Sequence, residues 1–125
     1  MALPHAQLLD VINVAPLGDK LRDTVSTSLT KTGRLQLLHM VLPAHRDVPE
    51  HHVEDECIIH CLEGLVEVTM PGGVRRLEGG NLVVLPARQR HGLRARVDSA
   101  LLVTLLLREG DAGNQGGAGN TRLGA

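Results

Sequence analysis

Short apolar segments separated by turns containing glycine or proline recur along most of this chain. The clearest segments are residues 34–42, 57–62, 65–70, 82–85 and 100–107. Turn signals at intervals of roughly 8–12 residues are typical of a β-sandwich or barrel and not of βαβ units. We therefore expect an all-β fold with little helix outside residues 16–24. The apolar segment 9–14 is expected to add a strand near the N-terminus.

The most informative single stretch is residues 79–91, which read GGNLVVLPARQRH. A short apolar run bounded by glycine and proline predicts a strand, and the basic turn after Pro86 carries His91 at its far end. Imidazole is the commonest metal ligand in proteins and a common general base near neutral pH. His91 is therefore the first candidate functional residue.

Length and charge narrow the possible partners. The chain has 125 residues and a formal net charge of -1, so no global field favours a nucleic acid or a membrane surface. It contains neither a secretory leader pattern nor an apolar run near the ~20 residues of a membrane span. We expect a single cytoplasmic domain over residues 1–108. Residues 109–125 are rich in glycine and are expected to form a disordered tail.

The composition also restricts the ligands. No Phe, Tyr or Trp is present, so no aromatic ring can stack on a sugar or base or enclose a cation. If Cys57 and Cys61 lie on one strand, their Cα atoms are about 13 Å apart, beyond the ~7 Å limit for a disulfide. Free thiols fit a reducing compartment.

Residues 80–95 match the second motif of the cupin superfamily, G-x5-P-x-G-x2-H-x3-N. Gly80, Pro86 and His91 occupy their motif positions, Arg88 replaces the inner glycine, and Ala95 replaces the asparagine. The chain thus resembles the small RmlC-like cupins over about residues 35–107. The resemblance implies a double-stranded β-helix, or jelly-roll, barrel.

The first cupin motif, G-x5-H-x-H-x3or4-E-x6-G, is degenerate here. His51 occupies the first histidine position and Gly64 the final glycine. His45 replaces the leading glycine, Val53 the second histidine and Cys57 the glutamate. In metal-binding cupins, three histidines and a glutamate at these positions hold iron, manganese, zinc, nickel or copper.

Carried over residue by residue, the resemblance keeps His51 and His91 as ligands, and Cys57 can be a third because thiolate binds zinc well. Val53 cannot coordinate a metal. A register one residue earlier would use Glu50 and His52 instead.

Two further alternatives remain open at the site. A β-bulge near Asp55 would turn Glu56 inward. Arg88, together with Arg90, would attract an anionic ligand to the barrel mouth or would form a solvated basic turn. His60 should face away from the barrel if Cys57 faces into it, because successive strand side chains alternate.

The resemblance does not fix an activity, because one fold hosts many functions. We favour a cupin that binds a small molecule through His51, Cys57, Arg88 and His91. The small molecule would bind together with one divalent transition metal (Zn, Fe, Mn or Ni) or without any metal. The first alternative is a metal-dependent dioxygenase, isomerase or lyase, and the second is a non-catalytic structural dimer. A homodimer is expected, because apolar edge strands favour pairing with a second copy.

Overall fold

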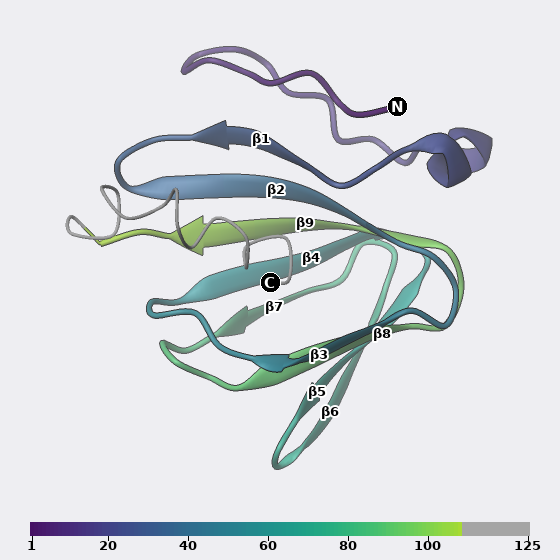
Figure 1. Cartoon of the computed structure of the whole chain (residues 1–125), viewed down its shortest axis with the longest axis vertical. Coiled ribbons are helices and arrows are strands. Elements are labelled where there is room, and N and C mark those ends of the chain that lie inside the picture. Colours follow the sequence, from purple (N-terminus) through teal and green to yellow (C-terminus); the bar gives the residue numbers. More distant parts are fainter. Residues whose placement is uncertain (109–125) are drawn as a thin grey trace.

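The computed structural model describes residues 1–108, and nearly all of its regular structure is β-strand (Figure 1). The one helix in this range is a short 3₁₀ helix, η1 (Gly18–Asp23). The sequence prediction of an all-β fold with helix only near residues 16–24 is therefore confirmed. The predicted tail, residues 109–125, lies outside the described residues. No helix within residues 1–108 is long and apolar enough to cross a membrane.

The strands form two antiparallel sheets that face each other. The five-stranded sheet has the order β1 (Thr27–Lys31), β2 (Leu35–Leu42), β9 (Ser99–Leu106), β4 (Cys57–Glu63) and β7 (Leu82–Leu85). The four-stranded sheet has the order β3 (Asp47–His51), β8 (His91–Ala95), β5 (Leu65–Met70) and β6 (Gly73–Glu78). This is the predicted jelly-roll arrangement, in which the chain crosses repeatedly between the sheets.

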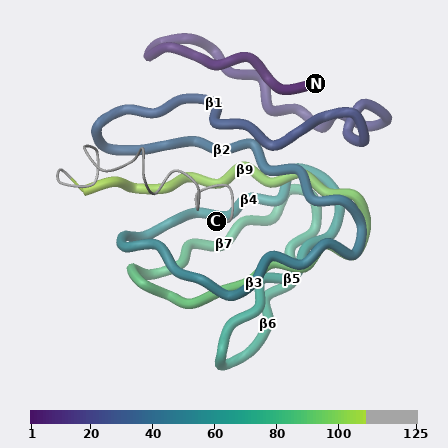
Figure 2. The backbone as a smooth tube through the Cα atoms, in the orientation of Figure 1, coloured from purple at the N-terminus to yellow at the C-terminus, as the bar shows by residue number. Residues whose placement is uncertain are grey.

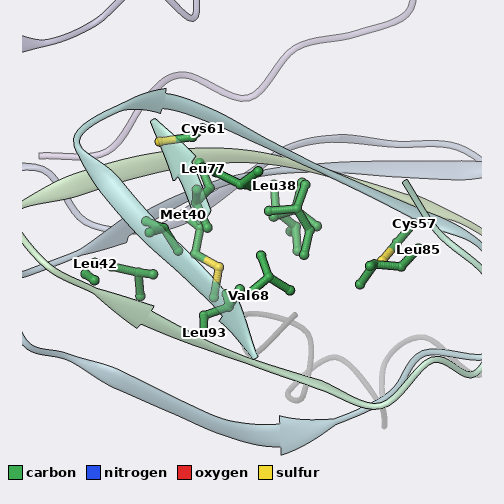
Figure 3. Close-up of a cluster of buried hydrophobic side chains, with 14 of the residues drawn as sticks. Leu38, Met40, Leu42, Cys57, Cys61, Val68, Leu77, Leu85 and Leu93 are labelled. Carbon is green, nitrogen blue, oxygen red and sulfur yellow. The ribbon is translucent and has the colours of Figure 1, made fainter. Parts of the chain in front are cut away.

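The hydrophobic core fills the space between the two sheets (Figure 3). Along β4, Cys57, Ile59 and Cys61 are buried while Ile58 and His60 are half-buried, so one face of the strand lines the core. Because the chain lacks aromatic residues, side chains of Leu, Ile, Val, Met, Ala and Cys make up this core. Such a core depends on close aliphatic packing.

Residues 1–17, here called the arm, are not a strand. The arm is the purple segment that runs beyond β1 (Figure 2). The strand predicted over residues 9–14 is therefore wrong. Leu9 has a φ of 76°, a left-handed conformation that interrupts an extended backbone. A tight turn holds Asp10 near Gln7, whose backbone N–H donates to the aspartate carboxylate over 2.8 Å. Apolar composition suggested a strand, but strand formation also requires a partner along the segment.

Candidate histidine site

Two imidazoles meet where β3 ends and β8 begins. His51 is the last residue of β3 and His91 the first of β8, and the two are register partners. Their ring centroids are 4.6 Å apart with the planes inclined by 48°. His91 is completely buried and His51 is half-buried. The structure thus brings together the two histidines that the motif spacing pairs.

Backbone carbonyls fix the tautomer of both rings. Nδ1 of His51 lies 3.0 Å from the Pro49 carbonyl oxygen, and Nδ1 of His91 lies 2.9 Å from that of Gln89. A carbonyl oxygen only accepts hydrogen bonds, so each Nδ1 must carry the proton and donate. In the neutral rings, the lone pair then resides on Nε2.

The Nε2 atom of His51 is buried and has no hydrogen-bond partner within residues 1–108. Burial lowers the pKa of His51, the Pro49 carbonyl opposes that shift, and nearby His91 and His52 lower the pKa further. The ring is therefore neutral at pH 7, and its Nε2 is an acceptor. Buried polar atoms are nearly always paired in folded proteins, so this atom marks a position for a donor or a metal ion.

The remaining cupin ligand positions supply no comparable group. Cys57 lies in the core, where burial raises the pKa of its thiol to about 11. A neutral thiol is a poor metal ligand. Val53 packs against the same core. Within residues 1–108, no group of three or more His, Cys, Asp or Glu side chains is arranged to hold a metal ion.

The alternative ligands named from the sequence lie on the surface. His52 is exposed, with Nε2 3.4 Å from the carboxylate of Glu54. Glu50 forms a 3.0 Å ion pair with Arg90, and Glu56 is exposed. In the structure, the side chains of His52 and Glu50 are therefore engaged in surface ion pairs.

Ion pairs balance the basic turn next to the site. The guanidinium of Arg88 lies 3.6 Å from Glu54, and its backbone N–H donates to the Val53 carbonyl over 3.0 Å. Arg90 is held by Glu50, which lies 40 residues earlier in the chain. Local sequence patterns do not reveal such distant acidic partners. The rim thus carries paired charges and not a free positive patch.

All four glycine positions of the two cupin motifs have a left-handed backbone here. The φ values are 69° at His45, 95° at Gly64, 96° at Gly80 and 62° at Arg88. Glycine adopts this conformation most readily. The backbone therefore keeps the family turn geometry at the two positions where the side chain departs from the motif.

Gly92 is a positioning residue that sequence reasoning missed. A Cβ atom on Gly92 would lie 2.8 Å from the Val48 carbonyl oxygen and 2.9 Å from the Thr69 hydroxyl. The missing side chain lets β3 approach β8 closely enough to place His51 beside His91. A glycine inside a strand pattern is the available signal, since it often marks a close backbone approach.

Other histidines lie away from this pair. His60 is on the face of β4 opposite Cys57, as alternation predicted. His39 is almost fully buried, and its Nδ1 has no hydrogen-bond partner in the part of the chain that the structure describes. Burial lowers the pKa of His39, and the charge of Glu63 partly offsets that effect.

The antiparallel jelly roll carries its two imidazoles at the histidine positions of the two motifs, where β3 ends and β8 begins. The sequence matches the Cupin domain family over residues 38–107, and the chain belongs to that family. No match was found among curated protein sequences.

Solved structures agree on the fold. An RmlC-like cupin from Desulfovibrio desulfuricans is 25% identical, with 82% of this chain and 97% of that chain covered and a TM-score of 0.61. KdgF from Halomonas sp. is also 25% identical, with 69% and 80% covered and a TM-score of 0.63. A cupin superfamily protein from Desulfitobacterium hafniense is 18% identical, with 67% and 77% covered and a TM-score of 0.64.

Proposed function

We propose that this cupin binds a small molecule through the Nε2 atom of His51, where the ring of His51 meets that of His91. The observation that carries the proposal is the buried Nε2 of His51, which has no partner among residues 1–108 although its tautomer makes it an acceptor. A ligand hydroxyl or N–H group that donates to it would satisfy an otherwise costly buried atom.

The surroundings favour a short hydroxy acid. The neutral His51 ring accepts a hydrogen bond from a hydroxyl donor, and Arg88 at the adjacent turn offers a cation to a carboxylate. Its present partner, Glu54, is half-exposed, as is Arg88. Such a surface ion pair contributes only about 0–1 kcal/mol, so an anionic ligand can replace the glutamate at little cost.

Titration of untagged protein with a panel of hydroxy acids (lactate, malate, tartrate, citrate) tests this proposal. Long-range ¹H–¹⁵N spectra should show Nε2 resonances of His51 and His91 moving on binding. The same titration of His51→Leu should show binding weakened by about 10-fold or more, the loss expected when a buried hydrogen bond is removed. His60→Leu is the matched control, because His60 lies on the opposite side of its sheet. Equal binding by wild type and His51→Leu would contradict the assignment.

The same lone pairs favour a divalent metal ion as a second candidate ligand. Two imidazoles fall short of the three or four ligands of usual zinc sites, and the carboxylate of the iron-binding facial triad is missing. A full cupin metal site therefore does not fit the described residues. Bound metal would have water or ligand atoms in its other positions, and only then would a metal-dependent dioxygenase, isomerase or lyase become the leading alternative.

Metal analysis of untagged protein, followed by Co²⁺ titration, separates these candidates. If metal binds, His91→Ala should abolish Co²⁺ retention, whereas Cys57→Ala should leave it unchanged. No thiolate-to-cobalt charge-transfer band should appear, because the pKa of the Cys57 thiol is about 11. Stoichiometric metal with such a band would overturn the histidine-only assignment.

We also propose a cytoplasmic location. Cys57 and Cys61 are free and buried, which fits a compartment that keeps thiols reduced. Cell fractionation of the native protein would test it.

A further inference from the structure

A cavity lies between β2 and β3, where the two sheets separate. Strand β1 pairs with β2 only as far as Thr27, which lies opposite His39, so β1 does not extend along residues 40–42. Strand β3, at the edge of the other sheet, begins at Asp47. The cavity in this open seam, here called the seam groove, has a volume of about 400 Å³, which is within the range of small-molecule sites.

The floor of the seam groove is apolar. Met40 and Leu42 line it from β2 and are almost fully buried, and half-buried Val48 packs against the same core from β3. Pro49 adds its ring to the wall and has no backbone N–H that would need a partner. Hydrocarbon is therefore the ligand surface that fits this floor.

The rim of the seam groove carries a guanidinium that no acidic side chain of residues 1–108 neutralises. Ion pairs with acidic side chains hold Arg22, Arg88, Arg90, Arg94, Arg96 and Arg108. Arg46, by contrast, lines the groove, is exposed and forms no ion pair with any of the described residues. Its charge is thus available to an anion.

The other polar groups of the rim leave this charge in place. The Asp47 carboxylate lines the groove, but Arg94 pairs with it over 3.4 Å. Ser26 Oγ accepts a hydrogen bond from the backbone N–H of Val41 over 2.8 Å, and its own hydroxyl lies 3.4 Å from the Val41 carbonyl oxygen. A hydrogen bond of that length is weak, so the hydroxyl can donate to an anion instead.

The seam groove is distinct from the histidine site. Asp47 is the first residue of β3 and His51 the last, and four residues of a strand span about 13 Å. Met40 and Leu42 also lie at the end of the core cluster that is away from Cys57 (Figure 3). A small ligand in the groove would therefore not contact the imidazole pair.

We propose that the seam groove binds a medium-chain alkyl carboxylate, with the carboxylate at Arg46 and the chain over the floor residues. A planar guanidinium matches a carboxylate through two parallel hydrogen bonds. The apolar floor favours an alkyl chain over a polyhydroxylated group, because buried hydroxyls without partners are costly. The proposal does not depend on the histidine site, whose proposed ligand is a short hydroxy acid.

Calorimetric titration of untagged protein with butyrate, hexanoate and octanoate tests the ligand class, below the concentration at which octanoate forms micelles. Each step adds two methylene groups and should tighten binding by on the order of 10-fold, because the added hydrocarbon is buried on the floor. 1-Octanol has the same chain length without the charge, and it should bind about 10-fold more weakly than octanoate.

Charge variants test the role of Arg46. Arg46→Gln should weaken octanoate binding by about 10-fold, because it removes hydrogen bonds from a charged donor. The matched control is Arg76→Gln on β6, at the opposite edge of the sheet from β3, where the arginine is also exposed. Octanoate should bind this control as it binds wild type. Both positions are on the surface, so both variants should fold.

A third variant and a spectrum separate this site from the histidine site. His51→Leu should bind octanoate as wild type does, even if it no longer binds hydroxy acids. In ¹H–¹⁵N spectra, octanoate should shift the backbone amide resonances of Ser26, Val41 and Val48. Absence of octanoate binding, equal binding by wild type and Arg46→Gln, or loss of octanoate binding in His51→Leu would overturn the proposal.

Discussion

At the scale of single residues, the His51 imidazole is held in its uncharged form. Its ring centroid lies 4.6 Å from that of His91, and burial together with the neighbouring His91 lowers the pKa of His51. The Nδ1 proton of His51 is donated to the Pro49 carbonyl oxygen. The backbone therefore leaves Nε2 of His51 as an acceptor, and acid should disturb this ring.

The folded protein should lose stability as the pH falls below about 6.5, the ordinary pKa of a histidine side chain, because burial lowers the pKa of both His51 and His39. The unfolded chain binds protons at these two residues before the folded chain does. Stability is therefore fully present above about pH 6.5 and declines as the pH falls through the lower folded pKa values. Urea denaturation at about pH 7.5 and about pH 5 measures this loss. His51→Gln should reduce the pH dependence, whereas His60→Gln should leave it nearly unchanged. A wild-type free energy of unfolding that is constant across this range would contradict the prediction.

Cys57 should be unreactive in the folded protein. Its pKa of about 11 means that only about one thiol in a thousand is ionised near pH 8, and the side chain is buried. Iodoacetamide should therefore modify it only after denaturation, since the thiolate is the nucleophile. Mass spectrometry of native and urea-treated samples measures the difference. Rapid labelling of the native protein would show that the thiol is open to solvent and ionised.

At the scale of elements, the spacing between β3 and β8 controls the histidine pair. Gly92→Ala would press a methyl group against the Val48 carbonyl and the Thr69 hydroxyl. Overpacking of this kind lowers the free energy of unfolding by about 1–3 kcal/mol. Because β3 is an edge strand, it should move away from β8. We expect a lower melting temperature and shifted His51 imidazole resonances. Gly33→Ala, which meets no atom within 4 Å, is the control and should change neither.

The turns offer a second test at this scale. His45 holds a φ of 69° and Gly80 one of 96°. A left-handed backbone costs an L-residue roughly 1–2 kcal/mol relative to glycine, while added glycine makes the unfolded chain more flexible. Gly80→Ala should therefore lower the free energy of unfolding by about 1 kcal/mol, and His45→Gly should raise it slightly. Thermal denaturation of the two variants measures both signs. Stabilisation by Gly80→Ala would show that the turn is not constrained.

The elements also show what local sequence determines. Strands β2, β5 and β7 follow short apolar runs bounded by Gly or Pro. Strand β4 ends directly before Gly64, and β9 begins at the Asp98-Ser99 turn. The meeting of His51 and His91 follows from motif spacing. The arm was mispredicted, because apolar residues such as Leu8 and Val11 suggest a strand whether or not a neighbouring strand is present. The ion pair of Arg88 with Glu54 was not foreseen either, since it depends on how two distant turns meet.

At the scale of the whole molecule, one aliphatic core joins the two sheets, with no aromatic ring to fill gaps. Aliphatic side chains leave a void when they are shortened, because the surrounding strands relax only partly. A residue that lies fully buried between the sheets should therefore contribute several times more to the free energy of unfolding than an exposed residue of the same type.

Leu38 is a suitable test of this dependence, because it is completely buried on β2 and belongs to the core cluster (Figure 3). Leu38→Ala should lower the free energy of unfolding by about 2–5 kcal/mol. Val74→Ala, at an exposed position, should change it by less than about 0.5 kcal/mol. Urea denaturation followed by far-UV circular dichroism measures both, since the chain has no tryptophan to report fluorescence. All variants are compared at one protein concentration, because self-association of any variant would make its stability depend on concentration. An equal decrease in the free energy of unfolding of the two variants would mean that this core does not hold the sheets together.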